Sequence, residues 1–272
     1  MNAQSQLPPS VYFMYRVFIQ FVCLLFFVVG WQLGSYRHPQ AEQGAPEGEP
    51  IKARNTTVTY RSGDLTLKAY LCIPEAEGPL PAVVFNHGGL GSRIGGAIEE
   101  TCRALAKAGF VGFSPIRRTE IPLRGHLDDV FAAIVYLKHL PYVDANRIAI
   151  MGFSRGGLLT TLVAARHSHD FAAVVLMAPA PPRPGNEWEF YTQARDISAP
   201  VLLLVAENDL AQYNNEGQDH VALTKKLHNT FVDARRQTQL IIYPPYRNNG
   251  HMMFFEVGKY WEDVVEFLQE NL

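Results

Sequence analysis

Gly152-Phe153-Ser154-Arg155-Gly156 is a G-x-S-x-G motif, and the interpretation of the whole chain starts from it. An apolar run, residues 148–151, precedes the motif, and a helix-like stretch, residues 157–165, follows it. A serine between a strand and a helix lies on a tight turn that projects its hydroxyl away from the sheet. The flanking glycines accommodate the strained turn and the close approach of strand and helix. The motif therefore predicts a nucleophilic Ser154, with a simple helix-capping serine as the alternative.

Length and composition indicate one globular α/β domain. The chain has 272 residues, of which 47% are hydrophobic and 18% charged, which is typical of a folded protein with a sizeable core. The formal charge of −2 and the absence of a basic run argue against a nucleic-acid partner. No C-x-x-C motif and no histidine–cysteine cluster has zinc-site spacing, so we expect no metal and no cofactor.

The three cysteines do not dictate a bridge. Cys23 lies in an apolar N-terminal stretch, which leaves Cys72 and Cys102 in the body of the chain. We expect these two to be free, buried thiols in preference to a disulfide.

The N-terminus predicts a targeting segment separate from the catalytic body. Residues 11–33 are long and apolar enough for a membrane span, although Arg16 and Gln20 interrupt them. A cleaved signal peptide is the alternative, but no A-x-A cleavage site follows. We therefore expect an N-terminal tail (1–10), an apolar helix serving as transmembrane anchor or signal segment (11–34), a flexible linker (35–52) and a catalytic domain (53–272). This domain is then membrane-anchored or exported, with the periplasmic or extracytoplasmic side favoured.

The body of the chain alternates short apolar runs with helical patterns. Residues 65–73 alternate apolar and polar side chains, as an antiparallel strand with one buried face does. The later runs are continuously apolar, as in parallel strands covered on both faces. We expect strands near residues 57–61, 65–73, 82–85, 111–113, 148–150, 172–176, 201–205 and 240–243, and helices near residues 98–108, 126–140, 154–167, 220–232 and 255–272. The pattern predicts an α/β fold with a parallel sheet and helices on both faces.

The acid and the histidine are expected in loops that follow two of the later strands. In such sheets the chemistry lies at the carboxyl ends of the strands. Asp209 follows the run 201–205, and His251 follows the run 240–243. A serine hydroxyl needs a histidine to take its proton, and the histidine needs a carboxylate to fix its tautomer. Glu207 is the rival acid, but Asp209 lies further beyond the strand end.

The oxyanion hole is expected from two backbone N–H groups. One is that of Arg155, the residue after the nucleophile, at a helix N-terminus. The other is expected in the loop after the third strand, where Gly89 is the favoured donor and Leu90 the alternative. His87 in the same loop is interpreted as a structural hydrogen-bonding residue.

Together these segments resemble a known branch of hydrolases. Asn86-His87-Gly88-Gly89, residues 144–157, Glu207-Asn208-Asp209 and Gly250-His251 look like the dienelactone-hydrolase-like and prolyl-oligopeptidase-like α/β-hydrolases. The resemblance spans residues 57–272. It implies an eight-stranded, mostly parallel sheet, hydrolysis of esters or related acyl compounds, and a triad of Ser154, Asp209 and His251. Dienelactone hydrolases proper use a cysteine nucleophile, so the serine here favours a general serine esterase.

Two regions are candidates for substrate binding. Trp188 and Tyr191 belong to an insertion that predicts a small cap over the site, with surface packing as the alternative. Arg117 and Arg118 follow the fourth strand and suit an acidic substrate group, unless they pair with local carboxylates. The leading hypothesis is a serine carboxylic-ester hydrolase acting on a small-molecule ester or acyl substrate. A peptidase or amidase for short substrates, and a catalytically silent membrane-tethered binding module, are the alternatives; the sequence does not indicate an oligomeric state.

Overall fold

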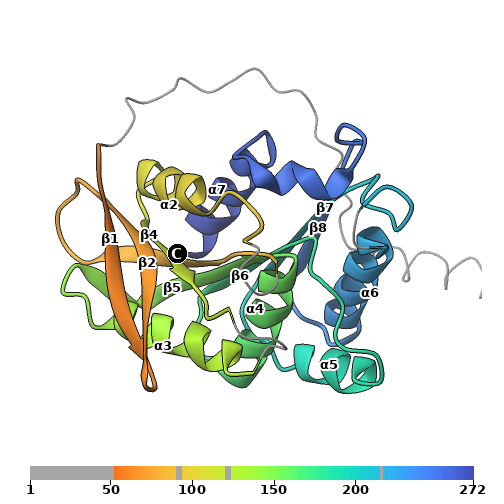
Figure 1. Cartoon of the computed structure of the whole chain (residues 1–272), viewed down its shortest axis with the longest axis horizontal. Helices are drawn as coiled ribbons and strands as arrows, with labels where there is room; N and C mark the ends of the chain where they lie inside the picture. Colours follow the sequence, from red (N-terminus) through yellow and green to blue (C-terminus); the bar gives the residue numbers. More distant parts are fainter. Residues whose placement is uncertain (1–51, 90–93, 120–123, 215–216) are drawn as a thin grey trace, which may run out of the picture. The chain divides into compact units, whose positions relative to one another are not determined.

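The computed structural model describes residues 52–89, 94–119, 124–214 and 217–272, and these form an α/β structure (Figure 1). Its strands are β1 (Ala53–Ser62), β2 (Leu65–Pro74), β3 (Leu80–Asn86), β4 (Val111–Ile116), β5 (Val143–Phe153), β6 (Ala173–Met177), β7 (Val201–Ala206) and β8 (Thr238–Tyr243). Its helices are α2 (Ile98–Lys107), α3 (His126–Lys138), α4 (Arg155–Arg166), α5 (Glu187–Ala194), α6 (His220–Asp233), the 3₁₀ helix η1 (Gly250–Phe255) and α7 (Tyr260–Asn271). The predicted N-terminal tail, apolar helix and nearly all of the linker lie outside the described residues.

The strands form a single eight-stranded sheet in the order β1-β2-β4-β3-β5-β6-β7-β8. β2 pairs antiparallel with both β1 and β4, and every later pair is parallel. The predicted eight-stranded, mostly parallel sheet is therefore confirmed. Parallel register brings the carboxyl ends of β3, β5 and β6 to the same edge, because Asn86 pairs with Gly152 and Gly152 with Leu176.

Alternate strand residues enter two cores on opposite faces of the sheet. Val84 and Ile150 belong to the core that includes residues of α3, α4 and α5, whereas Val83 and Met151 belong to the core that includes residues of α2 and α7. Figure 1 shows α2 and α7 on one side of the sheet and α3, α4 and α5 on the other. Burial of both faces explains why these strands are continuously apolar.

Two elements differ from the sequence-based expectation. α5 was not expected, because its segment was interpreted only as a cap insertion. The helix expected over 255–272 begins later, as α7 at Tyr260, and a separate 3₁₀ helix, η1, precedes it. η1 matters for the site, because His251 lies in it.

The expectation of two free thiols is wrong. Cys72 on β2 and Cys102 on α2 form a disulfide, with their Cα atoms 5.6 Å apart. The sequence separates them by 30 residues, and the pairing depends on α2 packing over the antiparallel strand β2. Strand and helix placement alone could not reveal that contact.

Helices that could span a membrane are absent from the part of the chain that the structure describes: none there is both long and apolar enough. The predicted anchor segment 11–34 lies outside that part.

Candidate active site

Ser154 occupies the turn between β5 and α4 in a strained backbone conformation. Its φ of 51° and ψ of −117° place a non-glycine residue at positive φ, where few side chains are tolerated. Backbone hydrogen bonds hold it there: its N–H donates to Met177 O at 2.9 Å, and its carbonyl accepts from Ala180 N–H at 2.8 Å. The predicted sharp turn is therefore braced by β6 and the loop after it.

Both motif glycines are required by close backbone approach. A Cβ on Gly156 would lie 1.9 Å from Asn86 O, and one on Gly152 would lie 2.4 Å from Gly156 O. Asn86 also donates from its side chain to Thr160 on α4 at 2.9 Å. The end of β3 and the first turns of α4 are thus in direct contact, and a larger residue would separate them.

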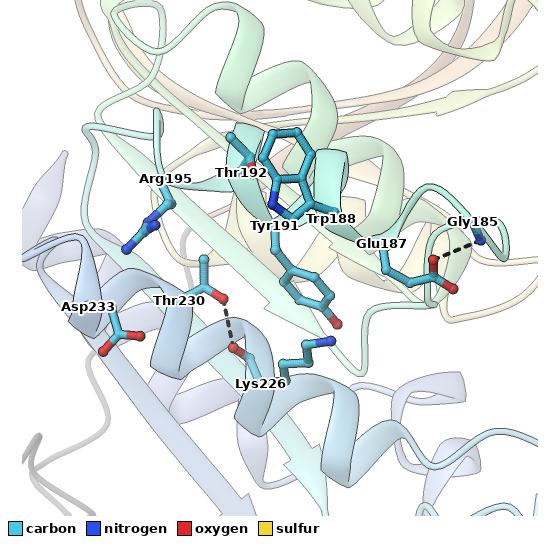
Figure 2. A pocket seen from close by; sticks show the side chains of 9 residues that line it. All are labelled: Gly185, Glu187, Trp188, Tyr191, Thr192, Arg195, Lys226, Thr230 and Asp233. Atoms are coloured by element: carbon cyan, nitrogen blue, oxygen red, sulfur yellow. Dashed lines mark hydrogen bonds between the residues drawn. The ribbon is translucent and has the colours of Figure 1, made fainter.

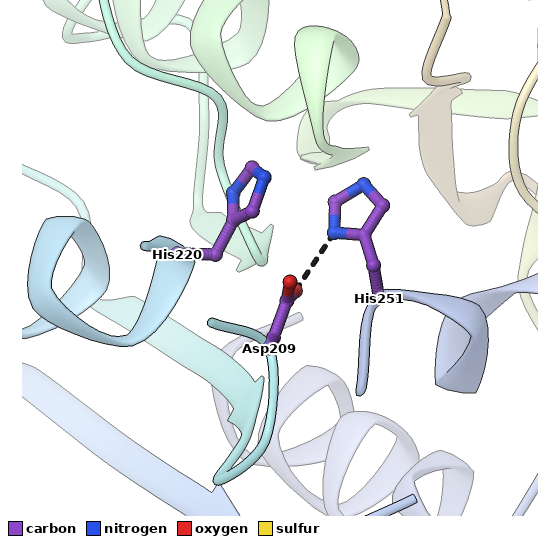
Figure 3. Close-up of side chains that lie close together, drawn as sticks. All are labelled: Asp209, His220 and His251. Carbon is purple, nitrogen blue, oxygen red and sulfur yellow. Dashed lines mark hydrogen bonds and ion pairs between the residues drawn. The ribbon is translucent and has the colours of Figure 1, made fainter. Parts of the chain in front are cut away.

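Asp209 and His251 meet at the same edge of the sheet (Figure 3). His251 Nδ1 lies 2.7 Å from Asp209 Oδ2, and both residues are buried. The other carboxylate oxygen of Asp209 accepts from Asn214 Nδ2 at 2.9 Å, and the side chain of Asn249 accepts from His251 N–H at 3.0 Å. Asp209 is therefore the carboxylate that contacts His251, whereas its rival Glu207 is exposed.

The ring of His251 lies beside the nucleophile turn. Its centroid is 4.7 Å from that of Phe153, the residue immediately before Ser154. The ring of His220, at the start of α6, stacks on it at 4.3 Å. Sequence reasoning placed His220 in a helix and gave it no role. No local motif marks it, because its contact with His251 depends on how the loop 209–220 closes.

Asp209, His220 and His251 also form the metal-capable group among the described residues, with one ligand atom from each within 4.8 Å of the others. His251 Nδ1 is already engaged by Asp209, and the two imidazole rings stack (Figure 3). Imidazole binds metal through lone pairs in the ring plane, and stacked rings do not direct these toward one point. The arrangement suits a hydrogen-bonded acid–base pair better than a metal centre.

The loop after β3 lies directly against Ser154. A Cβ on Gly88 would lie 2.9 Å from the Phe153 ring and 3.2 Å from Ser154 Cβ. Gly88 pairs with Gly95 across the loop, and Gly89 has a φ of +80°. This places the expected donor Gly89 near Ser154, while Leu90 lies outside the described residues. Arg155 is the first residue of α4, so its N–H belongs to the helix N-terminus.

Arg117 is buried and braces this loop. Its Nη1 donates to His87 O at 2.7 Å, and its backbone N–H donates to His87 Nε2 at 3.4 Å. His87 Nδ1 in turn lies 2.7 Å from Gly88 O and acts as the donor. Burial, with the positive charge of Arg117, lowers the pKa of His87 to about 3, so its ring is neutral. Burial also lowers the pKa of Arg117 to about 10, which leaves it charged at neutral pH.

Arg118 contacts a carboxylate of the fold. It donates to both oxygens of Asp129, from Nη2 at 2.6 Å and from Nε at 2.9 Å, and Ser62 adds a bond at 2.6 Å. Although burial opposes it, these hydrogen bonds lower the pKa of Asp129. The two arginines expected to bind substrate thus have protein partners, and Arg117 bonds to His87 in the loop after β3.

Trp188 and Tyr191 line a surface groove between α5 and α6 (Figure 2). The groove encloses about 550 Å³ and is also lined by Gly185, Glu187, Thr192, Arg195, Lys226, Thr230 and Asp233. Trp188 is 80% exposed, and Lys226 Nζ lies 4.2 Å from the centre of the Tyr191 ring. Ser154, Asp209 and His251 do not line this groove, so the aromatic residues expected to cap the site face a different surface.

Comparisons with known proteins agree with this architecture. The family model described as Dienelactone hydrolase family matches residues 119–271. A Bacillus subtilis (strain 168) relative, named uncharacterized peptidase YtmA, is 27% identical over 230 residues, which cover 71% of this chain and 88% of the relative.

Two solved structures show the same fold. The dienelactone hydrolase from Anabaena variabilis superimposes with a TM-score of 0.64 at 21% identity, covering 81% of this chain and 99% of that one. A putative dipeptidyl aminopeptidase IV from Bacteroides ovatus gives a TM-score of 0.65 at 20% identity, covering 82% of this chain. The chain spans only 36% of the length of that aminopeptidase.

Proposed function

The chain belongs to the dienelactone hydrolase family of α/β-hydrolases, and from this membership we propose that it is a serine hydrolase that cleaves carboxylic esters through an acyl-enzyme. The observation that carries the proposal is the strained Ser154 turn at the sheet edge where Asp209 and His251 share a 2.7 Å hydrogen bond. Strained backbone of this kind persists only when its surroundings enforce it, and it concentrates at functional sites.

In the proposed mechanism Ser154 Oγ attacks the ester carbonyl carbon while His251 Nε2 takes the hydroxyl proton. The carbonyl π electrons move to oxygen, and collapse of this tetrahedral intermediate expels the alkoxide. The alkoxide leaves as an alcohol after His251 returns the proton. Water, deprotonated by the same histidine, then attacks the acyl carbon. When this second tetrahedral intermediate collapses, the bond from Ser154 Oγ to the acyl carbon breaks, His251 returns the proton to Oγ, and the carboxylic acid leaves.

Asp209 holds His251 in the tautomer that this cycle needs. Its carboxylate accepts from Nδ1–H, which leaves the Nε2 lone pair available for the serine proton. The bond from Asn214 fixes the second oxygen of Asp209, so the carboxylate cannot rotate away. After proton transfer, the buried negative charge stabilises the imidazolium.

The backbone N–H groups of Gly89 and Arg155 are the proposed oxyanion donors. The close packing of Gly88 on Ser154 and the position of Arg155 at the N-terminus of α4 support this assignment. The donors act on the negative oxygen of the tetrahedral intermediate, where preorganised N–H groups are most effective.

A fluorophosphonate probe tests the mechanism, because it reacts with an activated serine. Full-length protein is expected to be labelled on Ser154, and S154A is expected to remain unlabelled. H251A and D209N should be labelled far more slowly while retaining the wild-type circular dichroism spectrum. Equal labelling of wild type and S154A would refute the nucleophile, and a wild type that is inert would favour a silent binding module.

A peptidase or amidase is the second candidate, and the names of two similar proteins favour it. The Bacillus subtilis relative is named a peptidase, and the Bacteroides ovatus structure a dipeptidyl aminopeptidase. Parallel kcat/KM measurements on p-nitrophenyl acyl esters and on aminoacyl and dipeptidyl p-nitroanilides separate the two. We expect ester turnover to exceed anilide turnover. The reverse order would make the chain a peptidase with the same triad.

For location, we propose that residues 11–34 anchor the chain in a membrane and that its body lies on the extracytoplasmic side. The apolar length of residues 11–33 supports the anchor, and the Cys72–Cys102 disulfide supports an oxidising compartment. Two measurements on cells test these points. Fractionation shows whether the chain is in the membrane, and a maleimide-polymer, added to acid-quenched samples before and after reduction, shows whether the two cysteines are oxidised. A full-length chain in the soluble fraction with both body thiols reduced would contradict the proposal. A shortened, soluble, oxidised chain would identify a cleaved signal peptide instead.

A further inference from the structure

His220 is a fully buried histidine that the proposed chemistry does not use. It is the first residue of α6 and is 0% exposed. Its backbone N–H donates to the carbonyl of Asp209 at 3.0 Å, so it closes the loop that carries the proposed acid. Asn214, in the middle of that loop, bonds Asp209 Oδ1 and also donates to Gln218 O. His220 therefore anchors the segment that holds the Asp209 carboxylate in place.

The ring of His220 contacts the proposed base directly. Its centroid is 4.3 Å from that of His251, with an angle of 29° between the planes (Figure 3). The Phe153 ring lies 4.7 Å from the same imidazole at 38°. An imidazole with one ring stacked on it and a second, tilted ring beside it has little freedom to turn about its side-chain bonds, which keeps its Nε2 in one direction.

The same side chain also reaches the loop that braces the nucleophile. His220 Nδ1 lies 3.2 Å from Pro179 O, an atom that can only accept, so Nδ1 carries the proton. Pro179 packs against α4, because a Cβ on Gly157 would lie 3.0 Å from it. The next residue, Ala180, donates its N–H to Ser154 O at 2.8 Å.

We propose that His220 is a positioning residue that holds the three segments of the triad together: the Asp209 loop through its backbone, His251 through its ring, and the Ser154 turn through Pro179. The proposal rests on the proposed function, since it assigns His220 a role in that same triad. His220 is assigned this role through its contacts with Asp209, His251 and Pro179.

Three substitutions separate the contributions of the ring and its donor. H220L removes both, H220F keeps an aromatic ring, and H220N keeps a short donor without a ring. We expect H220L to lower kcat on a p-nitrophenyl ester about 10–100-fold, with KM changed less than about twofold, because small misplacements of reacting groups cost that much. H220F should retain most of kcat, because it keeps a ring packed on His251.

His228 provides a matched control, since it is a buried histidine on the same helix, about 12 Å further along the axis. H228L should lower the unfolding temperature yet leave kcat unchanged. The proposal is overturned if folded H220L matches wild type in kcat, or if H228L reproduces the H220L loss of kcat at unchanged KM. If H220L does not fold, H220N and H220F decide the matter. A loss of kcat in H220N but not in H220F supports positioning by the stacked ring. An unchanged kcat in both variants refutes the positioning role of His220. Fluorophosphonate labelling of the wild-type protein tests the proposed nucleophile independently of His220. Labelled wild type with unaffected His220 variants would refute only the role of His220, whereas unlabelled wild type would refute the proposed function.

Discussion

At the scale of single residues, the site depends on buried polar residues that are held by specific hydrogen bonds. The side chains of His87 and Arg117, at most 4% exposed, bond to backbone carbonyls, whereas Ser154, 2% exposed, is held by its own N–H and carbonyl. A buried polar group without a partner costs about 1–3 kcal/mol, so each pairing selects one loop geometry over its alternatives. Arg117 has particular influence, because it binds the carbonyl of the peptide that precedes Gly88.

We predict that R117M impairs catalysis by displacing the oxyanion loop. Methionine replaces the aliphatic stem of arginine but has no donor, so His87 O loses its 2.7 Å bond and the Gly89 N–H loses its alignment. The expected loss is about 10–100-fold in kcat, with a smaller change in KM, because the donors act mainly on the transition state. Steady-state kinetics on an ester measure it. R118M is the control, since Arg118 contacts Asp129 and not His87: it should lose thermal stability but keep kcat. Equal kcat in R117M and wild type would reject the bracing role.

Local sequence was sufficient to predict the site residues that directly follow a strand. It was insufficient to predict the residues that contact the site only through tertiary packing. The G-x-S-x-G motif led to Ser154, and the strand pattern led to the contact now seen between Asp209 and His251. His220 and Asn214 carry no such signal, because they approach Asp209 only when the loop 209–220 folds back on itself. The burial of Arg117 was equally hidden, since a charged pair after a strand resembles a substrate anchor.

At the scale of elements, α5 and the β2–α2 contact are where expectation and structure diverge most. The insertion before β7 forms a short helix whose Trp188 is 80% exposed, on a groove that the triad does not line. The two body cysteines sit on elements that are distant in sequence and adjacent in the fold. Both outcomes depend on how a helix is laid on the sheet, which periodicity does not specify.

For α5 we predict that W188A leaves activity on small substrates nearly unchanged. The side chain is mostly in solvent and belongs to the groove between α5 and α6, so the expected changes are less than about twofold in kcat/KM on p-nitrophenyl acetate and within about 0.5 kcal/mol in stability. Kinetics and urea unfolding measure these. F190A serves as contrast, because Phe190 on the same helix is buried in the core and its loss should cost about 3–5 kcal/mol. A selective loss of ester activity in W188A would restore α5 as a cap.

For the β2–α2 contact we predict that the disulfide supports stability without affecting chemistry. Removing a cross-link between residues 30 positions apart increases the entropy of the unfolded chain, so the C72S/C102S variant should be less stable by about 3–4 kcal/mol. Urea unfolding with and without reductant measures this. Reductant should lower wild-type stability to that of the variant and leave the variant unchanged. The kcat of the folded variant should equal that of wild type, and an equal stability of the two proteins in oxidising buffer would show that the bridge contributes nothing.

At the scale of the whole molecule, His87 links stability to catalysis, because this buried histidine lies in the loop that carries the proposed oxyanion donor Gly89. His87 is neutral in the fold because burial and Arg117 lower its pKa to about 3, whereas in the unfolded chain it titrates near 6.5. Between these values the unfolded chain binds a proton that the folded chain does not. The contribution of neutral His87 to the free energy of unfolding is therefore fully present above about pH 6.5 and is lost as the pH falls toward 3.

We predict from this that the free energy of unfolding falls with acidification more steeply in wild type than in H87Q. Glutamine can accept from Arg117 N–H in place of Nε2 but cannot titrate. The wild-type protein should lose about 3 kcal/mol from this source between pH 6.5 and pH 4, in addition to the losses from carboxylates such as Asp129 that both proteins share. Urea unfolding at half-unit pH intervals gives the two slopes. Parallel slopes would mean that His87 is protonated in the fold, and the oxyanion loop would then have to be held by a charged histidine beside Arg117, an arrangement that their 3.4 Å contact disfavours.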